Sequence, residues 1–254
     1  MTRPGILASL LLAIVSLIII GDAAIFCFIQ EESPFVSALG AIALVLALLM
    51  SMVLFLFPFE ERFSSVGGAL GIVSSITIVA VALPSFGNDY VDVAILSLII
   101  LGVVFIHRER YYDLEKGMVS RQFALVVLIL LPILSAIVGS YLLRADIENR
   151  FAVSPPIFFI PFAALFGYLE EVVFRGGVQR EMAPLTGPNR ALVCGAVLDA
   201  GLMVFWGSYA LIAFTFVLAM LLGYIYKKCG SVTLVGVTRA IEASWLMIIL
   251  AMLA

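Results

Sequence analysis

The chain consists of long runs of apolar residues separated by short polar segments. A helix needs about 20 apolar residues to cross the hydrocarbon core of a bilayer. Two runs, at 91–106 and 191–206, are short enough to be tilted or re-entrant. The pattern predicts an all-α, polytopic membrane bundle of eight to nine transmembrane helices, at roughly 5–29, 35–59, 66–86, 91–106, 123–143, 155–169, 191–206, 209–226 and 232–254.

Composition agrees with this pattern. The chain has 254 residues, of which 64% are hydrophobic and 12% are charged, whereas soluble domains are roughly 45–50% apolar and about 25% charged. A soluble fold of this length could not bury so much apolar surface, so membrane lipid is the expected partner. The net charge of −3 provides no basic surface for nucleic acid. Three cysteines are too few for a disulfide framework or a zinc site.

The distribution of cationic residues predicts the orientation of the helices. If the N-terminus is cytoplasmic, Arg144 and Arg150 are the only cationic residues expected in the outer loops. This bias toward the inner side predicts a multi-pass protein with a cytoplasmic N-terminus and an outer C-terminus. The eleven cations then expected on the inner side are Arg3, Arg62, Arg108, Arg110, Lys116, Arg121, Arg175, Arg180, Arg190, Lys227 and Lys228.

Ionisable residues at membrane depth gather in the C-terminal half of the chain. Each costs about 2.5–3.5 kcal/mol on insertion scales, so each needs a partner or a function. On an α-helix, Glu171 and Arg175 could form an i,i+4 ion pair. Glu170 would then face a cavity, where it could act as a general base toward water. Alternatively, all three residues are solvated at a helix end on the membrane surface.

The segment Glu170–Gly176, with the sequence EEVVFRG, resembles the EExxxR motif of the CPBP family in its EExxFRG form. This family includes CAAX prenyl proteases of the Rce1 type, bacteriocin-processing proteins and Abi proteins, which are polytopic membrane endopeptidases. The resemblance covers roughly residues 120–254 and implies a CPBP-like membrane domain there. About four N-terminal transmembrane helices would occupy residues 1–119.

The resemblance also implies roles for the motif residues. In the family, the first glutamate activates water together with a histidine of a second motif, FxxxH. A third motif, a histidine followed four residues later by Asn or Asp, stabilises the oxyanion. The first glutamate corresponds to Glu170, its neighbour to Glu171 and the arginine to Arg175. The resemblance therefore implies peptide-bond hydrolysis centred on Glu170.

Both histidines of the family are missing from this chain. The FxxxH motif falls on the segment from Asp199 to Met203, and the third motif falls on Arg239 and Ala243. The single histidine, His107, lies upstream of the resembling region. Each missing group typically contributes about 10²–10⁴-fold in rate. Activity therefore requires that other residues replace the two histidines.

Asp199, Arg239 and Glu242 are the candidate replacements, and each also has a structural alternative. Asp199 could share a proton with Glu170, as the two acids of aspartic proteases do, or it could pair with Arg239 or Arg175. Arg239 could stabilise an oxyanion as a fixed cation, or it could form an i,i+3 ion pair with Glu242.

The count of buried charges leaves an excess of acid. Glu170, Glu171, Asp199 and Glu242 oppose only Arg175 and Arg239, so two negative charges remain to be balanced by protons or a cation. No metal-ligand spacing is present, and we expect neither a metal nor a cofactor.

Three functions fit these observations. The first is an intramembrane endopeptidase that acts on peptides or prenylated proteins. The second is a catalytically inactive CPBP homologue that serves as a membrane scaffold or as a subunit beside partner membrane proteins. The third is a proton or cation transporter that uses its buried carboxylates.

Overall fold

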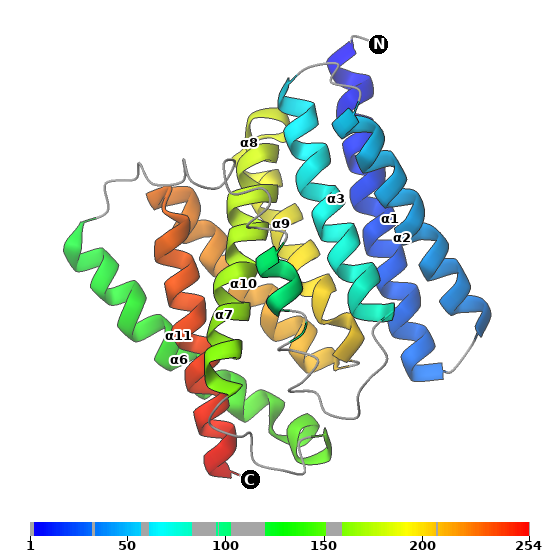
Figure 1. Cartoon of the computed structure of the whole chain (residues 1–254). Coiled ribbons are helices and arrows are strands. Elements are labelled where there is room, and N and C mark those ends of the chain that lie inside the picture. The colour runs from blue at the N-terminus through cyan, green and yellow to red at the C-terminus, as the bar shows by residue number, and fades with distance from the viewer. Residues whose placement is uncertain are drawn as a thin grey trace. The chain divides into compact units, whose positions relative to one another are not determined.

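The structure, a computed structural model, describes residues 3–31, 34–56, 61–82, 95, 97–102, 120–150, 159–206 and 208–253 (Figure 1). All regular secondary structure within these ranges is helical. The elements with defined bounds are α1 Arg3–Glu31, α2 Pro34–Leu56, α3 Glu61–Ala82, α6 Arg121–Arg150, α7 Ile160–Glu171, η2 Val172–Gln179, α8 Arg180–Thr186, α9 Pro188–Leu202, η3 Met203–Trp206, α10 Tyr209–Cys229 and α11 Val232–Leu253.

Five helices in the described ranges are long and apolar enough to cross a membrane. They contain the segments Ser9–Cys27, Ala38–Leu56, Gln122–Leu143, Tyr209–Cys229 and Val232–Ile249. The predicted all-α membrane protein is thereby confirmed. The count of eight to nine spans stays a prediction, because most of the run at 91–106 lies outside the described residues.

Two further predicted spans form short helices, and the predicted orientation remains open. α7 has 12 residues and α9 has 15, so at about 1.5 Å per residue each alone is shorter than a bilayer core. His107, Arg108, Arg110 and Lys116 lie outside the described residues. The positions of the two termini across the membrane therefore stay predictions, as does the domain boundary at 119/120.

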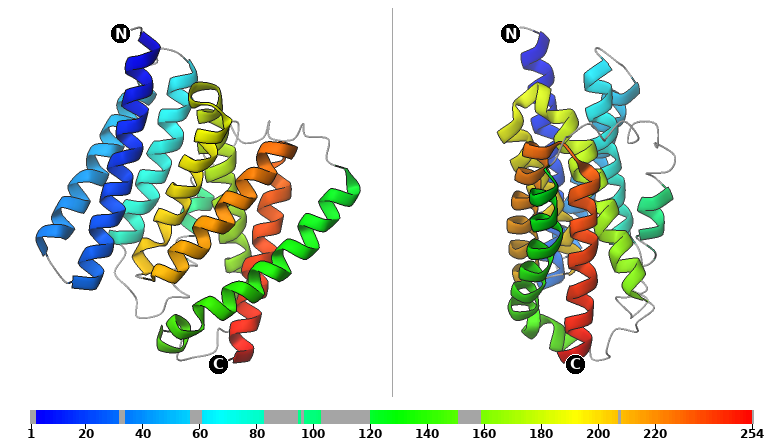
Figure 2. Two further views of the ribbon diagram at one scale, coloured as in Figure 1. Left: turned by 180° about the vertical axis from the view of Figure 1, so that it is seen from behind. Right: turned by 90° about the vertical axis from the view of Figure 1, so that its left-hand side faces the viewer.

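One compact unit consists of Met1–Ala82 and Val173–Met220. Within it, α2 packs against both α1 and α3, and the three helices run side by side (Figures 1 and 2). Gly67 on α3 permits the close approach to α2, because a Cβ there would lie 2.7 Å from the Cβ of Leu54. Small residues commonly serve this purpose in membrane helix pairs. α9 contacts both α1 and α8.

The second compact unit consists of Leu83–Val172 and Leu221–Ala254. Within it, α11 packs against α7 and α6, and α6 crosses α11 obliquely (Figure 2). Two glycines bring α7 and α11 together. A Cβ on Gly167 would lie 3.0 Å from the carbonyl oxygen of Arg239, and one on Gly236 would lie 2.8 Å from Cδ2 of Tyr168. Gly167 thus lets the residues that follow it on α7 approach the middle of α11.

We predict that Gly167→Ala destabilises the protein by about 1–3 kcal/mol, because the added methyl group meets backbone atoms of α11 that cannot move away. Gly102→Ala is the matched control, since Gly102 is exposed and helical and its added Cβ would meet no heavy atom within 4 Å. The measurement is equilibrium unfolding in mixed detergent micelles. Equal stability of the two variants would contradict the close packing of α7 on α11.

Candidate functional site

The charged residues of the EEVVFRG segment are buried. Glu170 and Glu171 are each 1% exposed, and Arg175 is fully buried. The alternative in which these residues are solvated at a helix end is therefore wrong. Burial of three ionisable groups in an apolar protein requires that they be paired or hydrogen bonded.

The backbone of this segment changes its helical register. α7 ends at Glu171, and a π-helix, η2, follows it over Val172–Gln179. A π-helix closes its hydrogen bonds from residue i to i+5, and such turns are often found at functional sites. The i,i+4 argument for a Glu171–Arg175 pair assumed an α-helix, so this pair stays a prediction.

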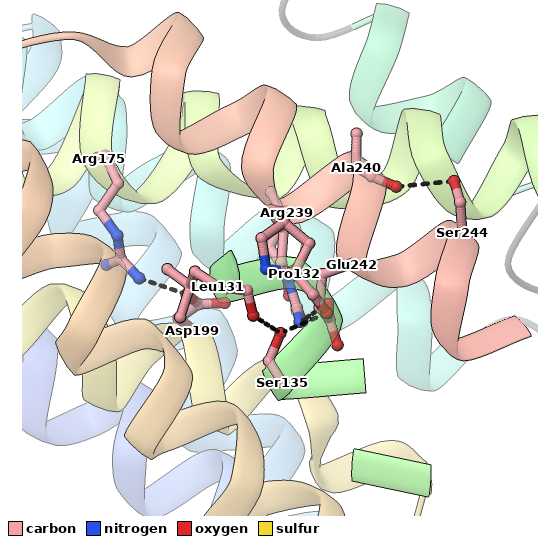
Figure 3. A network of polar contacts seen from close by, with 10 residues as sticks. Leu131, Pro132, Ser135, Arg175, Asp199, Arg239, Ala240, Glu242 and Ser244 are labelled. Carbon is pink, nitrogen blue, oxygen red and sulfur yellow. Dashed lines mark hydrogen bonds and ion pairs between the residues drawn. The ribbon is translucent and has the colours of Figure 1, made fainter. Parts of the chain in front are cut away.

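Arg175 forms a buried ion pair with Asp199. Its Nη2 donates a hydrogen bond of 2.7 Å to Oδ2 of Asp199, which is 2% exposed (Figure 3). Gly195 on α9 makes room for the guanidinium, because a Cβ there would lie 3.2 Å from Nη1 of Arg175. The alternative in which Asp199 pairs with Arg175 is thereby confirmed. This bond connects η2 to α9 within the first unit.

Arg239 joins two carboxylates in the second unit. Its Nε donates to Oε2 of Glu170 at 2.9 Å, and its Nη1 donates to Oε2 of Glu242 at 2.6 Å. The i,i+3 pair of Arg239 and Glu242 confirms the sequence prediction, and Figure 3 shows it. The bond to Glu170 connects α7 to α11 and was not predicted. We call Glu170, Arg239 and Glu242 the acid–arginine triad.

The acid–arginine triad contains two acids and one permanent cation. Glu170 and Glu242 are each 1% exposed, and Arg239 is 9% exposed. Oε1 of Glu170 and Oε1 of Glu242 are both buried and accept no hydrogen bond from the described residues. Arg239 therefore binds each acid through its Oε2 and leaves one unsatisfied acceptor, Oε1, on each acid.

The proposed carboxylate dyad stays a prediction. Glu170 belongs to the second unit and Asp199 to the first, and each has an arginine partner within its own unit. In the described ranges, no group of three or more His, Cys, Asp or Glu side chains has an arrangement suited to a metal ion. The catalytic roles assigned from the family motif also stay predictions.

Two features of the buried polar network went unrecognised in the sequence. The glycines at 167 and 236 each precede a charged residue of the triad by three positions, a signal of close packing beside a buried charge. Asp22 on α1 is also buried, and its Oδ2 lies directly against Gly201 of α9. In the sequence, Asp22 is an isolated acid within an apolar run, and this pattern could have indicated that it is buried.

The fold and site define an integral membrane protein whose buried charges connect pairs of helices. Residues 152–245 match the model of the Rce1-like family, described as type II CAAX prenyl endopeptidase Rce1-like. This segment includes the EEVVFRG motif, Asp199 and the whole acid–arginine triad. This match covers less than half of the chain and supports membership of the CPBP family. No curated protein and no solved structure matches the chain.

We predict that Arg239→Met destabilises the protein by about 3–5 kcal/mol, because two buried carboxylates lose their only cation within the triad. The variant in which all three charges are removed, Glu170→Gln with Arg239→Met and Glu242→Gln, should recover most of this loss. Arg190→Met is the control for loss of an exposed arginine and should change stability by less than about 0.5 kcal/mol.

The measurement is the free energy of unfolding in mixed micelles. If the uncharged triple variant is as unstable as Arg239→Met, unpaired charge is not the cause of the loss.

Proposed function

We propose that this chain is a CPBP-family membrane protein without peptidase activity, which serves as a scaffold or a subunit of a membrane assembly. The observation that carries this proposal is the 2.9 Å bond from Nε of Arg239 to Oε2 of Glu170. By the family resemblance, Glu170 stands at the position of the water-activating base. Arg239 stands at the position of the oxyanion-stabilising histidine.

The residues at these two positions, Glu170 and Arg239, form an ion pair with each other. A general base must reach a water proton, and an oxyanion site needs donors aimed at a developing charge. Here Nε and Nη1 of Arg239 donate to Glu170 and Glu242, so these two donors are already occupied. Arginine also stays charged under all ordinary conditions, so it cannot transfer a proton as histidine does.

The position of the second family histidine supports the same proposal. Met203 occupies it by the spacing of the motif, and this side chain is 4% exposed. A thioether cannot accept a proton from water at neutral pH, and it is only a weak hydrogen-bond acceptor. Met203 therefore offers Glu170 no partner for water activation, while buried ion pairs still connect helices that carry the motif.

Residual endopeptidase activity is the second candidate function. One observation favours it: Oε1 of Glu170 accepts no hydrogen bond from the described residues, which leaves an acceptor position for water or substrate. In this case Arg239 would orient the carboxylate through Oε2, and Oε1 would act as the base. Transport of protons or cations stays a prediction from the sequence.

We predict that the purified protein does not cleave a prenylated CAAX peptide above the background set by Glu170→Gln, because both histidine functions are missing. The measurement is peptide cleavage followed by mass spectrometry in detergent and in liposomes, with an active CAAX protease as the positive control. Cleavage by the wild-type protein that Glu170→Gln abolishes would instead establish the endopeptidase. A scaffold or subunit role further requires co-migration with partner proteins in mild membrane extracts.

Restoring the residue types of the family extends this test. Met203→His combined with Arg239→His and Ala243→Asn should produce cleavage if the fold still binds the peptide, since each restored group contributes about 10²–10⁴-fold. The same variant with Glu170→Gln should be inactive. Because Glu242 loses its partner in these variants, folding is checked first by size-exclusion chromatography.

A further inference from the structure

The acid–arginine triad contains one more acid than it can neutralise. Glu170 and Glu242 accept hydrogen bonds from the same guanidinium, so one positive charge faces two carboxylates. On α11, Arg239 and Glu242 are the sole charged residues. Over 122–143, the apolar part of α6 that packs along α11 carries no charged residue.

The neighbouring groups on α7 and on the apolar part of α6 do not supply the missing charge. On α7, the charged residues are Glu170 and Glu171, so the neighbour of Glu170 adds further negative charge. The Ser135 hydroxyl on α6, drawn in the same view as Arg239 and Glu242, donates to the carbonyl of Leu131 on its own helix (Figure 3). Over α7, α11 and residues 122–143 of α6, Arg239 is thus the one cationic residue.

Bulk water does not reach the excess charge either. Both acids are 1% exposed, and the second oxygen of each is buried without a donor among the described residues. An uncompensated charge in a low-dielectric interior costs far more than a neutral carboxyl group, and such groups take up a proton instead. Glu242 also lies near the middle of the span Val232–Ile249, where this cost is greatest.

We propose that the acid–arginine triad is a proton-binding site that holds one proton on Glu170 or Glu242 at neutral pH. The ligand is a proton, and the two free oxygens, Oε1 of each acid, are its acceptors. One acid then remains ionised and pairs with Arg239, and the other is a neutral carboxyl group. The contact of α7 with α11 is thereby made dependent on pH. This proposal holds whether or not the chain has peptidase activity.

Infrared spectroscopy near neutral pH tests the proposal. The protein is expressed with isotope-labelled glutamate, because the label separates the carbonyl bands of glutamate from those of Asp22 and Asp199. The wild-type protein should show the band of one protonated glutamate. Glu170→Gln and Glu242→Gln should each abolish it, because one acid then faces one guanidinium. Glu171→Gln should retain it, since this residue forms no part of the triad.

Unfolding measured against pH gives a second readout. An unfolded glutamate ionises at about pH 4.3, so the folded triad binds one proton more than the unfolded chain near neutral pH. The unfolding equilibrium constant should therefore rise about tenfold per pH unit from this proton. Glu242→Gln should lower that slope by one proton, and Glu171→Gln should not.

Three results would overturn the proposal. The first is a wild-type spectrum with no band from a protonated glutamate. The second is a band that persists in Glu170→Gln or in Glu242→Gln, since protonation would then reflect burial of one acid rather than the excess charge. The third is stabilisation by sodium over choline at constant ionic strength that Glu242→Gln removes, which would assign a metal cation to the site.

Discussion

The bond between Arg239 and Glu170 is the interaction on which the organisation of the site depends. It joins α7 to α11 at the place where the glycines 167 and 236 bring these helices together. A charge buried in a membrane protein needs a partner or a function. Arg239 is the partner of Glu170, the first acid of the family motif. The same bond engages the two residues that the family resemblance identifies with water activation and oxyanion stabilisation, so one interaction underlies both the helix packing and the proposed lack of peptidase activity.

The buried charges form two groups of ion pairs, one within each compact unit. In the first unit, Arg175 and Asp199 neutralise one another between η2 and α9. In the second unit, two acids share Arg239, which leaves an excess that a proton can remove. A glutamate that is paired or already protonated has little capacity to take a proton from water. The proposed proton-binding site is therefore compatible with the proposed lack of peptidase activity.

The membrane class and the local ion pair could be predicted because both depend on short-range patterns. Apolar runs identified the five long helices, and the three-residue spacing identified the pair of Arg239 with Glu242. The bond from Arg239 to Glu170 joins residues 69 positions apart and depends on how α7 packs against α11, which no spacing rule encodes. The π-helix after Glu171 likewise has no local sequence signature, so the α-helical spacing assumed for Glu171 and Arg175 does not describe the backbone there, and the pair itself stays a prediction.

A double-mutant cycle between residues 170 and 239 tests this account most directly. Free energies of unfolding are measured for the wild-type protein, Glu170→Gln, Arg239→Met and the double variant in mixed micelles. A buried, hydrogen-bonded ion pair predicts a favourable coupling energy of about 1–3 kcal/mol. A coupling energy of about zero, with the two single losses simply adding, would show that the two side chains do not interact and would contradict the account.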